Sequence, residues 1–149
     1  MLQKLHKNKG GFTLVEIMIV VAIIALLAAI AVPNFLRARK RSQATRILED
    51  LRQVANAIDQ LAIEKNVPQD EVIDWDDLRP YFKPGSVLAT VEDEGVDIFG
   101  RPYITATQTV NDLPRVHEDT AAEFEGIVDE NFWAPYGPGE PDASPTATP

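Results

Sequence analysis

Glu16 raises the clearest chemical question in the sequence, because it places a carboxylate at the start of an apolar run. The sixteen residues 17–32 that follow it carry no charged or polar side chain. A carboxylate costs about 2.5 kcal/mol or more near the centre of a bilayer, and less near an interface. Glu16 could therefore reach toward the lipid headgroups, or it could meet a cation. Cleavage between Gly11 and Phe12 would create one, the α-ammonium of Phe12, which can neutralise Glu16 of a neighbouring copy.

Residue types that support catalysis or metal binding are scarce elsewhere. The absence of cysteine excludes disulfides, thiolate metal sites and cysteine nucleophiles. His117 is the one histidine outside residues 1–11, and a solvated loop is favoured over a metal site there. The acidic stretch 92–97 lacks the alternating aspartates of a calcium loop, so calcium is disfavoured. We find no Ser/His/Asp set, phosphate-binding glycine loop or zinc-type histidine pair, and expect no cofactor, catalytic site or metal site, hence no enzyme.

The apolar run itself has three interpretations. Residues 12–36 form a stretch of 25 residues, about 37 Å long as a helix, which is enough to cross a hydrocarbon core of about 30 Å. With basic residues in 4–9 before it, the stretch could be a secretory signal peptide cleaved at the small residues 29–31. It could also be a plain signal anchor. The third interpretation is a precursor that is cut before the run begins, and Glu16 favours it because a signal peptide gains nothing from a carboxylate.

Charge is distributed unevenly along the chain. A basic cluster follows the apolar run: Arg37, Arg39, Lys40, Arg41, Arg46 and Arg52. From Gln53 onward there are five basic and twenty acidic residues, a formal charge of −15. Such a charge repels nucleic acid, so we expect no nucleic-acid partner. Beside an apolar span, the basic cluster is expected to meet lipid headgroups or neighbouring subunits.

The N-terminal residues also resemble a known family. The stretch 9–24, which reads KGGFTLVEIMIVVAII, is similar to the N-terminus of type IV prepilins and pseudopilins, and the likeness continues over 27–35. It covers about 30 residues, with Ala25 where the family often has glycine. The resemblance implies a membrane prepilin peptidase that cuts after Gly11 and N-methylates Phe12, and it gives Glu16 a role in docking subunits. It also implies a single-pass protein of the inner membrane, with Met1 in the cytoplasm and the acidic part periplasmic, or extracellular after assembly.

A shorter likeness occurs further along. Residues 97–103, DIFGRPY, resemble the Asp-Pro-Trp-Gly-x-Pro-Tyr segment of the major pseudopilins of type II secretion. The calcium loop that follows this segment in the family has no matching residues here. The preferred reading is a structural filament subunit, a type II secretion pseudopilin, whose partners are neighbouring subunits and the inner-membrane assembly platform. The alternatives are a type IV pilus subunit for adhesion, motility or DNA uptake, or a membrane-anchored periplasmic binding domain.

The expected fold class is α+β, in which a long helix packs on a small domain of short helices and a small antiparallel sheet. Pro33 should kink the long helix rather than end it, because the apolar pattern resumes beyond it. Apolar residues then recur every three or four positions, which indicates an amphipathic helix that ends near Asn66. The buried stripe is expected to comprise Ile47, Leu48, Leu51, Val54, Ala55, Ile58, Leu61 and Ala62.

The remaining elements are expected to be short. Asp74 should cap a helix that turns Trp75, Leu78 and Phe82 inward. The stretches 87–91 and 103–110 are typical of strands. Thr120 and Glu123 fit a capping box that opens another helix, with Ala121, Phe124, Ile127 and Val128 inward, and residues 132–136 should fold back on the core.

The predicted organisation has five parts. Residues 1–11 are the leader, 12–36 the membrane or filament-core half of the long helix, and 37–65 its amphipathic half. Residues 66–136 form the globular domain. Residues 137–149 form a Pro/Ala/Ser/Thr-rich tail that is expected to be disordered.

The first prediction concerns the cleavage site. The mature chain is expected to begin at Phe12 with a methylated amine, because a cationic leader and two glycines precede the apolar run. Mass analysis of the N-terminus of membrane or filament material measures this. A chain beginning at Val32 would establish the signal-peptide interpretation instead.

Overall fold

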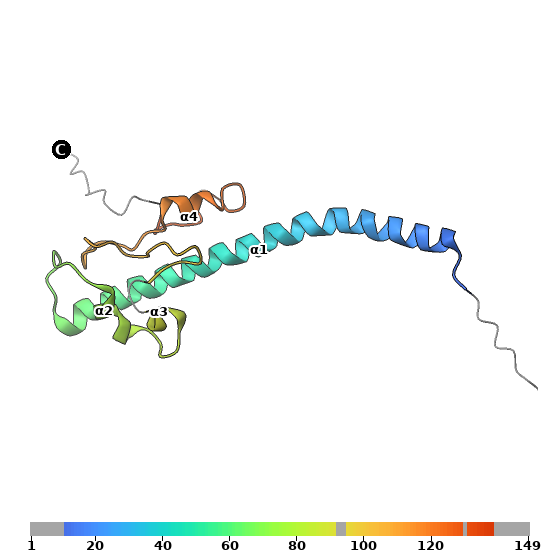
Figure 1. Cartoon of the computed structure of the whole chain (residues 1–149). Coiled ribbons are helices and arrows are strands. Elements are labelled where there is room, and N and C mark those ends of the chain that lie inside the picture. The colour runs from blue at the N-terminus through green and yellow to red at the C-terminus, as the bar shows by residue number, and fades with distance from the viewer. Residues whose placement is uncertain (1–10, 92–94, 130, 139–149) are drawn as a thin grey trace, which may run out of the picture. The chain divides into compact units, whose positions relative to one another are not determined.

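A computed structural model describes residues 11–91, 95–129 and 131–138. Its helices are α1 (Leu14–Lys65), α2 (Trp75–Leu78), the 3₁₀ turn η1 (Arg79–Tyr81), α3 (Val87–Thr90) and α4 (Glu118–Ala122) (Figure 1). The chain divides into two compact units, one up to Ala38 and the other from Arg39 onward. Most of the predicted leader and tail, and part of the acidic stretch 92–97, lie outside the described residues.

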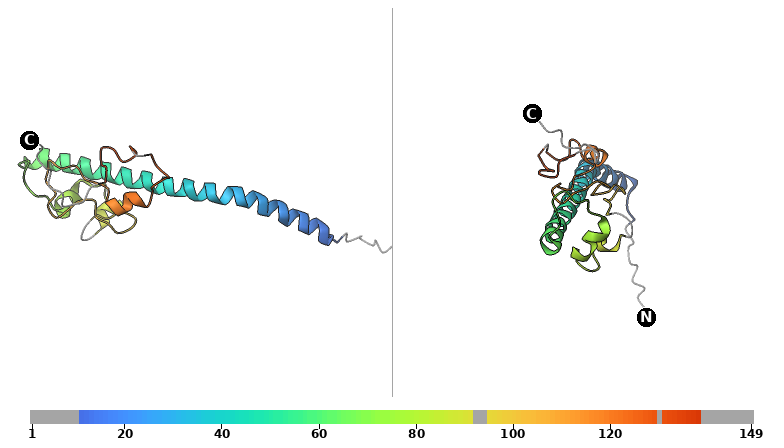
Figure 2. Two further views of the ribbon diagram at one scale, coloured as in Figure 1. Left: turned by 90° about the horizontal axis from the view of Figure 1, so that it is seen from above. Right: turned by 90° about the vertical axis from the view of Figure 1, so that its left-hand side faces the viewer.

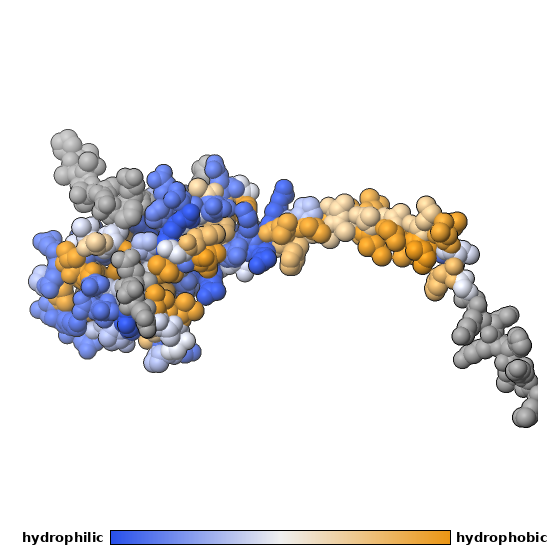
Figure 3. Space-filling model, viewed as in Figure 1, coloured by the Kyte–Doolittle hydropathy of each residue, from blue (hydrophilic) through white to orange (hydrophobic). Residues whose placement is uncertain are grey.

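The first unit contains the apolar part of α1. The helix continues through Pro33, so the alternative that the helix ends there is wrong, while the kink remains a prediction. All side chains from Phe12 to Leu36 are exposed, and this part of the helix is coloured almost wholly as apolar in Figure 3. By length and composition, α1 could cross a membrane. An apolar surface on every side of a helix requires lipid or other helices around it.

The second unit is built on the rest of α1, whose buried side chains recur at the predicted spacing. The stripe is confirmed in its main members, and the buried residues of α1 are Ala44, Ile47, Leu48, Leu51, Val54, Ala57, Ile58 and Leu61. Two predicted members of the stripe, Ala55 and Ala62, are only half-buried. Two alanines that were not predicted, Ala44 and Ala57, are buried. Figure 2 shows the short helices beside this part of α1. The helix ends at Lys65 as predicted, since Asn66 has a left-handed φ of 49°.

Segment 74–82 folds as expected. The Asp74 carboxylate accepts a hydrogen bond from the Trp75 amide and forms a capping box with Asp77. Trp75, Leu78 and Phe82 are all buried, and the rings of Trp75 and Phe82 stack with centroids 5.0 Å apart. Residues 132–136 also return to the core, where Trp133 is buried against the other apolar side chains.

The predicted antiparallel sheet is not seen in the described residues. The expected strand 87–91 is wrong, because Val87–Thr90 forms helix α3. The Ser86 hydroxyl caps this helix by accepting a hydrogen bond from the Ala89 amide at 3.3 Å. The Thr90 hydroxyl donates back to the Val87 carbonyl at 3.0 Å, a bond that a strand could not provide.

The expected strand 103–110 is wrong as well. In the described chain this segment contributes one residue to an isolated antiparallel bridge, Thr109 with Val72, and a second such bridge, Val96 with Pro102, lies just before it. The remaining backbone turns back on itself, with the Gln108 amide donating to the Thr105 carbonyl at 3.0 Å.

Local side-chain hydrogen bonds explain why these polar residues do not form a ladder. The Thr109 hydroxyl donates to the Asp112 carboxylate at 2.6 Å, and the Gln108 side-chain amide donates to the Asp112 carbonyl at 2.7 Å. Polar side chains that bond nearby groups in this way compete with strand pairing. The alternating threonines of 103–110 therefore belong to turns and not to a strand.

Gly95 is the glycine whose lack of a side chain the packing requires. A Cβ placed on it would lie 1.9 Å from the Trp75 indole, far inside van der Waals contact. Because Trp75 is fully buried, the ring cannot move away without disturbing the core.

We therefore expect Gly95→Ala to lower the free energy of unfolding by about 3 kcal/mol, near the upper end for overpacked cores. Chemical denaturation of a fragment of residues 37–138 measures this, since it contains both Gly95 and the control position Gly137; we expect this fragment to fold as a monomer. Gly137→Ala is the matched control, because a Cβ there meets nothing within 4 Å. Equal stability of the two variants would contradict the packing argument.

Candidate functional site

Glu16 lies in the first turn of α1, where its side chain closes the start of the helix. Its carboxylate accepts hydrogen bonds from the Thr13 amide at 2.9 Å and from the Thr13 hydroxyl at 2.8 Å. The Glu16 amide donates in return to the Thr13 hydroxyl at 3.2 Å. This is a capping box, in which two donors of the helix N-terminus are satisfied reciprocally.

Thr13 is a residue that the functional interpretation of the sequence missed. The signal was present, because Thr13-Leu14-Val15-Glu16 has the Thr-x-x-Glu spacing of a capping box. The interpretation of Glu16 as a charged group did not include its second role, as a cap of the helix start. A carboxylate fixed by Thr13 is held in one orientation, which is what a precise contact to another group requires.

Gly11 and Phe12 lie immediately before this turn. Both are exposed, and the Phe12 side chain is 83% accessible. In the uncut chain the Phe12 nitrogen belongs to the peptide bond with Gly11 and carries no charge. Within the described residues, the structure thus places the predicted cleavage bond one turn from Glu16. Pro33 lies seventeen residues further along the helix, apart from this group.

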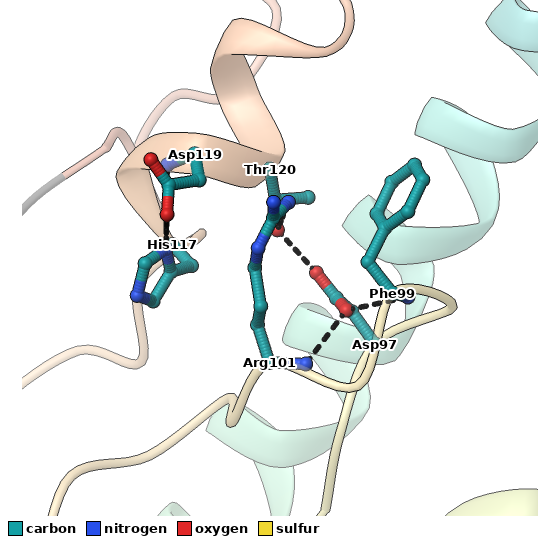
Figure 4. A network of polar contacts seen from close by, with 6 residues as sticks. All are labelled: Asp97, Phe99, Arg101, His117, Asp119 and Thr120. Carbon is teal, nitrogen blue, oxygen red and sulfur yellow. Dashed lines mark hydrogen bonds and ion pairs between the residues drawn. The ribbon is translucent and has the colours of Figure 1, made fainter.

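A second polar group lies in the segment 97–103, shown in Figure 4. Asp97 is buried and accepts hydrogen bonds from the amides of Phe99 at 2.8 Å and Arg101 at 3.0 Å, and from the hydroxyl of Thr120. Arg101 donates to the same hydroxyl at 3.0 Å, and its guanidinium lies 5.2 Å from the centre of the Phe99 ring. Gly100, with φ of 81°, allows the tight turn.

This second group has a structural role. Every named contact of the Asp97 carboxylate is to the protein itself, so it ties the 97–101 turn to helix α4. Over the described residues, no group of three His, Asp or Glu side chains could hold a metal ion.

Thr120 corrects a prediction from the sequence. It does not open α4, because the helix begins at Glu118 and His117 is the residue before it. The His117 imidazole accepts a hydrogen bond from the Asp119 amide at 3.3 Å. Thr120 is fully buried inside the helix, and its hydroxyl is directed to Asp97. Its partner Asp97 lies 23 residues earlier in the sequence, so local spacing does not reveal this buried hydrogen bond.

Tyr103 joins the end of the same segment to α1. Its hydroxyl donates to the Asp50 carboxylate at 2.9 Å. Burial, followed by the charge of Asp50, raises the pKa of Tyr103 well above its ordinary value, so the phenol stays protonated. Burial also raises the pKa of Asp50, against the opposing effect of the hydrogen bond from Tyr103.

Residues 6–32 match the family described as "Prokaryotic N-terminal methylation motif". The chain is 43% identical over 65 residues to the "Type IV major fimbrial protein FimA" of Dichelobacter nodosus, covering 44% of this chain and 42% of the relative. It is 43% identical over 60 residues to the "Type IV wide pilus major component PilA4" of Thermus thermophilus, covering 40% and 46%.

A third relative is the "Type IV major pilin protein PilA" of Myxococcus xanthus, 41% identical over 63 residues, which are 42% of this chain and 29% of that protein. The chain thus spans less than half the length of each of these relatives. No solved structure matches it. The N-terminal part of the chain thus carries the prepilin-type methylation motif and is similar to type IV pilins.

The Asp50–Tyr103 contact yields a prediction about pH. The pKa of Asp50 is raised in the folded state, so the folded chain holds the carboxyl proton more tightly than the unfolded chain does. This raises the free energy of unfolding at low pH, and the gain is lost as pH rises through the folded pKa. Asp50→Asn removes the buried charge but keeps an oxygen that can accept from Tyr103.

We expect the stability of the Asn variant, relative to the natural chain, to increase between about pH 3 and pH 7. The change should be below about 1 kcal/mol, since the carboxyl is only half-buried. Denaturation of both proteins across this range measures it, with Asp59→Asn as an exposed control on the same helix. A pH-independent difference would contradict the assignment.

Proposed function

We propose that this chain is a structural subunit of a type IV pilus-like filament. In this proposal a prepilin peptidase cuts after Gly11 and Phe12 is methylated. Before assembly, the apolar part of α1 holds the subunit in the inner membrane with its N-terminus in the cytoplasm and its acidic unit periplasmic. The observation that carries the proposal is the fixed Glu16 carboxylate at the head of an exposed apolar helix, directly after the cleavage motif.

The exposed apolar surface of α1 supports two successive environments, first lipid and then the helices of other copies. Its apolar side chains from Leu14 to Leu36 can be covered by lipid in the membrane or by the same helices of other copies. Glu16 favours the second state. In a bundle its charge can be compensated by the ammonium of a neighbour's Phe12, whereas in lipid it must reach an interface.

The partners follow from this assembly. They are neighbouring pilin-like subunits, the prepilin peptidase, the inner-membrane assembly platform and the lipid bilayer. The relatives are named as fimbrial or pilus components, which supports a subunit of a structure and not an enzyme.

Between the two kinds of filament, the comparisons favour a type IV pilus. The sequence alone placed a type II secretion pseudopilin first, but the relatives reported above carry pilin and fimbrial names. The pseudopilin is kept as the second candidate because residues 97–103 resemble a pseudopilin segment. In this structure that segment is a turn, and its buried Asp97 ties it to α4 through Thr120.

Variants of Glu16 test the proposal, and the capping box decides which variant to use. Glu16→Ala removes both the charge and the bonds to Thr13. Glu16→Gln removes only the charge, since glutamine also closes a capping box. Removing one partner of a buried ion pair costs about 3–5 kcal/mol, and the loss recurs at every subunit added.

We therefore expect both variants to be inserted and cleaved normally but to fail to enter filaments, even with wild-type subunits present. Immunoblots of membrane and sheared-filament fractions measure insertion, processing and incorporation. Thr13→Ser is the control that keeps the capping hydroxyl, and it should assemble. Incorporation of Glu16→Gln at the wild-type level would show that the charge is not needed, and loss confined to Glu16→Ala would assign Glu16 to helix capping alone.

A further inference from the structure

The second unit carries exposed cations at one end of its helix. Arg39, Lys40, Arg41 and Arg46 form a basic belt on α1, and all four side chains are exposed. At 100° per residue, the consecutive members Arg39, Lys40 and Arg41 point in different directions around the helix, so the belt is not confined to one face. Among the described residues, no carboxylate lies within 4 Å of any belt cation. Lys40 donates to a backbone carbonyl, that of Glu123, at 3.4 Å.

Cations further along the unit behave differently. Arg52 pairs with Glu49, and Lys65 pairs with Asp77 at 3.1 Å. These carboxylates come from within the same unit and neutralise their partners locally. Within the described residues the basic belt is thus a cluster of neighbouring cations without an ion pair, although Arg46 also acts on the charge of Asp50. Its positive charge is available to another molecule.

The opposite charge is exposed at the other end of α1. Asp70 and Glu71 form an acidic tip in the turn that follows the helix, where the Glu71 amide donates to the Pro68 carbonyl at 3.1 Å. Within the described residues neither carboxylate has an ion pair. The helical path from Arg41 to Lys65 is about 36 Å at 1.5 Å per residue, so belt and tip of one copy cannot meet.

We propose that the basic belt of one copy docks on the acidic tip of a second copy, in a head-to-tail contact along the filament. This inference rests on the proposed filament function. A copy displaced along the helix axis by about the length of this helical segment brings the two charged regions opposite each other. The distal acidic charge of −15 per chain makes any contact between two distal regions repulsive, which leaves the belt as the favourable partner.

Such pairs are exposed and individually weak, so their effect is to select the register of neighbouring copies more than to hold them together. The apolar side chains of α1 hold the copies together without fixing an axial position, since they are similar along the whole run. The proposed pair of Glu16 with a neighbour's Phe12 ammonium sets the position at the helix start. Belt and tip would set the position of the copy that lies further along the axis.

Charge reversal in the full chain tests the contact. One variant carries Arg39→Glu, Lys40→Glu and Arg41→Glu, a second carries Asp70→Lys and Glu71→Lys, and a third carries all five. Each single-region variant should lower the yield of sheared filaments by about tenfold, because reversal replaces attraction with repulsion at every contact. The variant that carries all five substitutions should recover most of the yield. Arg52→Glu with Glu49→Lys reverses a local pair and should leave the yield unchanged.

Several results would overturn the proposal. They are normal yield in the single-region variants, or no recovery in the combined one. Loss of the belt variant from the membrane fraction would show instead that the belt binds lipid headgroups. If the wild-type chain itself forms no filaments, the proposed function fails and this contact fails with it. If wild-type filaments form and reversal has no effect, only the contact is wrong.

The absence of cysteine permits a direct measurement of the same contact. Lys40→Cys combined with Glu71→Cys in one chain should give a ladder of cross-linked copies when filaments are oxidised. The control pair Gln53→Cys with Glu71→Cys keeps the thiol at the tip but moves the second thiol from the belt to Gln53, an exposed position further along α1. A ladder from the control pair that equals or exceeds that from the test pair would contradict the head-to-tail register.

Discussion

The burial of a single long helix in two different environments is the constraint on which the rest of the structure depends. The first part of α1 has apolar side chains on every side, and the second part has one apolar stripe. An all-round apolar surface is stable only in lipid or among other helices, whereas a stripe is satisfied by one layer of packed residues. The covering layer is supplied by the second unit of this chain, and the first surface must be covered by something else.

The small size of the second unit explains how much it relies on α1. Its largest fully buried side chains outside the long helix, Trp75 and Phe124, join one core cluster with the stripe of α1. Without regular strands in the described residues, the connecting loops are secured by side chains. Asp97 fixes the turn to α4 and Tyr103 fixes the adjoining segment to Asp50 of α1. Polar contacts of this kind take the place of the hydrogen-bond ladder that a sheet would provide.

The sequence predicted well those features that depend on local periodicity or on neighbouring residues. The end of α1 near Asn66, its buried stripe and the Asp74 cap are local and were correct. The sheet and the Thr120 cap were wrong for the opposite reason. In the segment 103–110 it is Thr109 that bonds to Asp112, and Thr120 bonds to Asp97, which is far away in the sequence. The pattern of residue types alone reveals neither partner. In the candidate site, the Thr-x-x-Glu spacing of Thr13 and Glu16 was sufficient to predict the capping box, but this prediction was not made.

The capping role of Glu16 and its proposed docking role are compatible because they use different properties of one side chain. Capping needs an oxygen that accepts from Thr13, while docking needs a negative charge, and a carboxylate provides both. Capping also limits the rotamers of Glu16 before any neighbour arrives, which lowers the entropy lost when an ammonium binds. A carboxylate free in the apolar run would have to be ordered at each addition. In the proposed assembly, the capping box at the helix start therefore orients the charge of Glu16, and the apolar surface that follows it supplies the driving force.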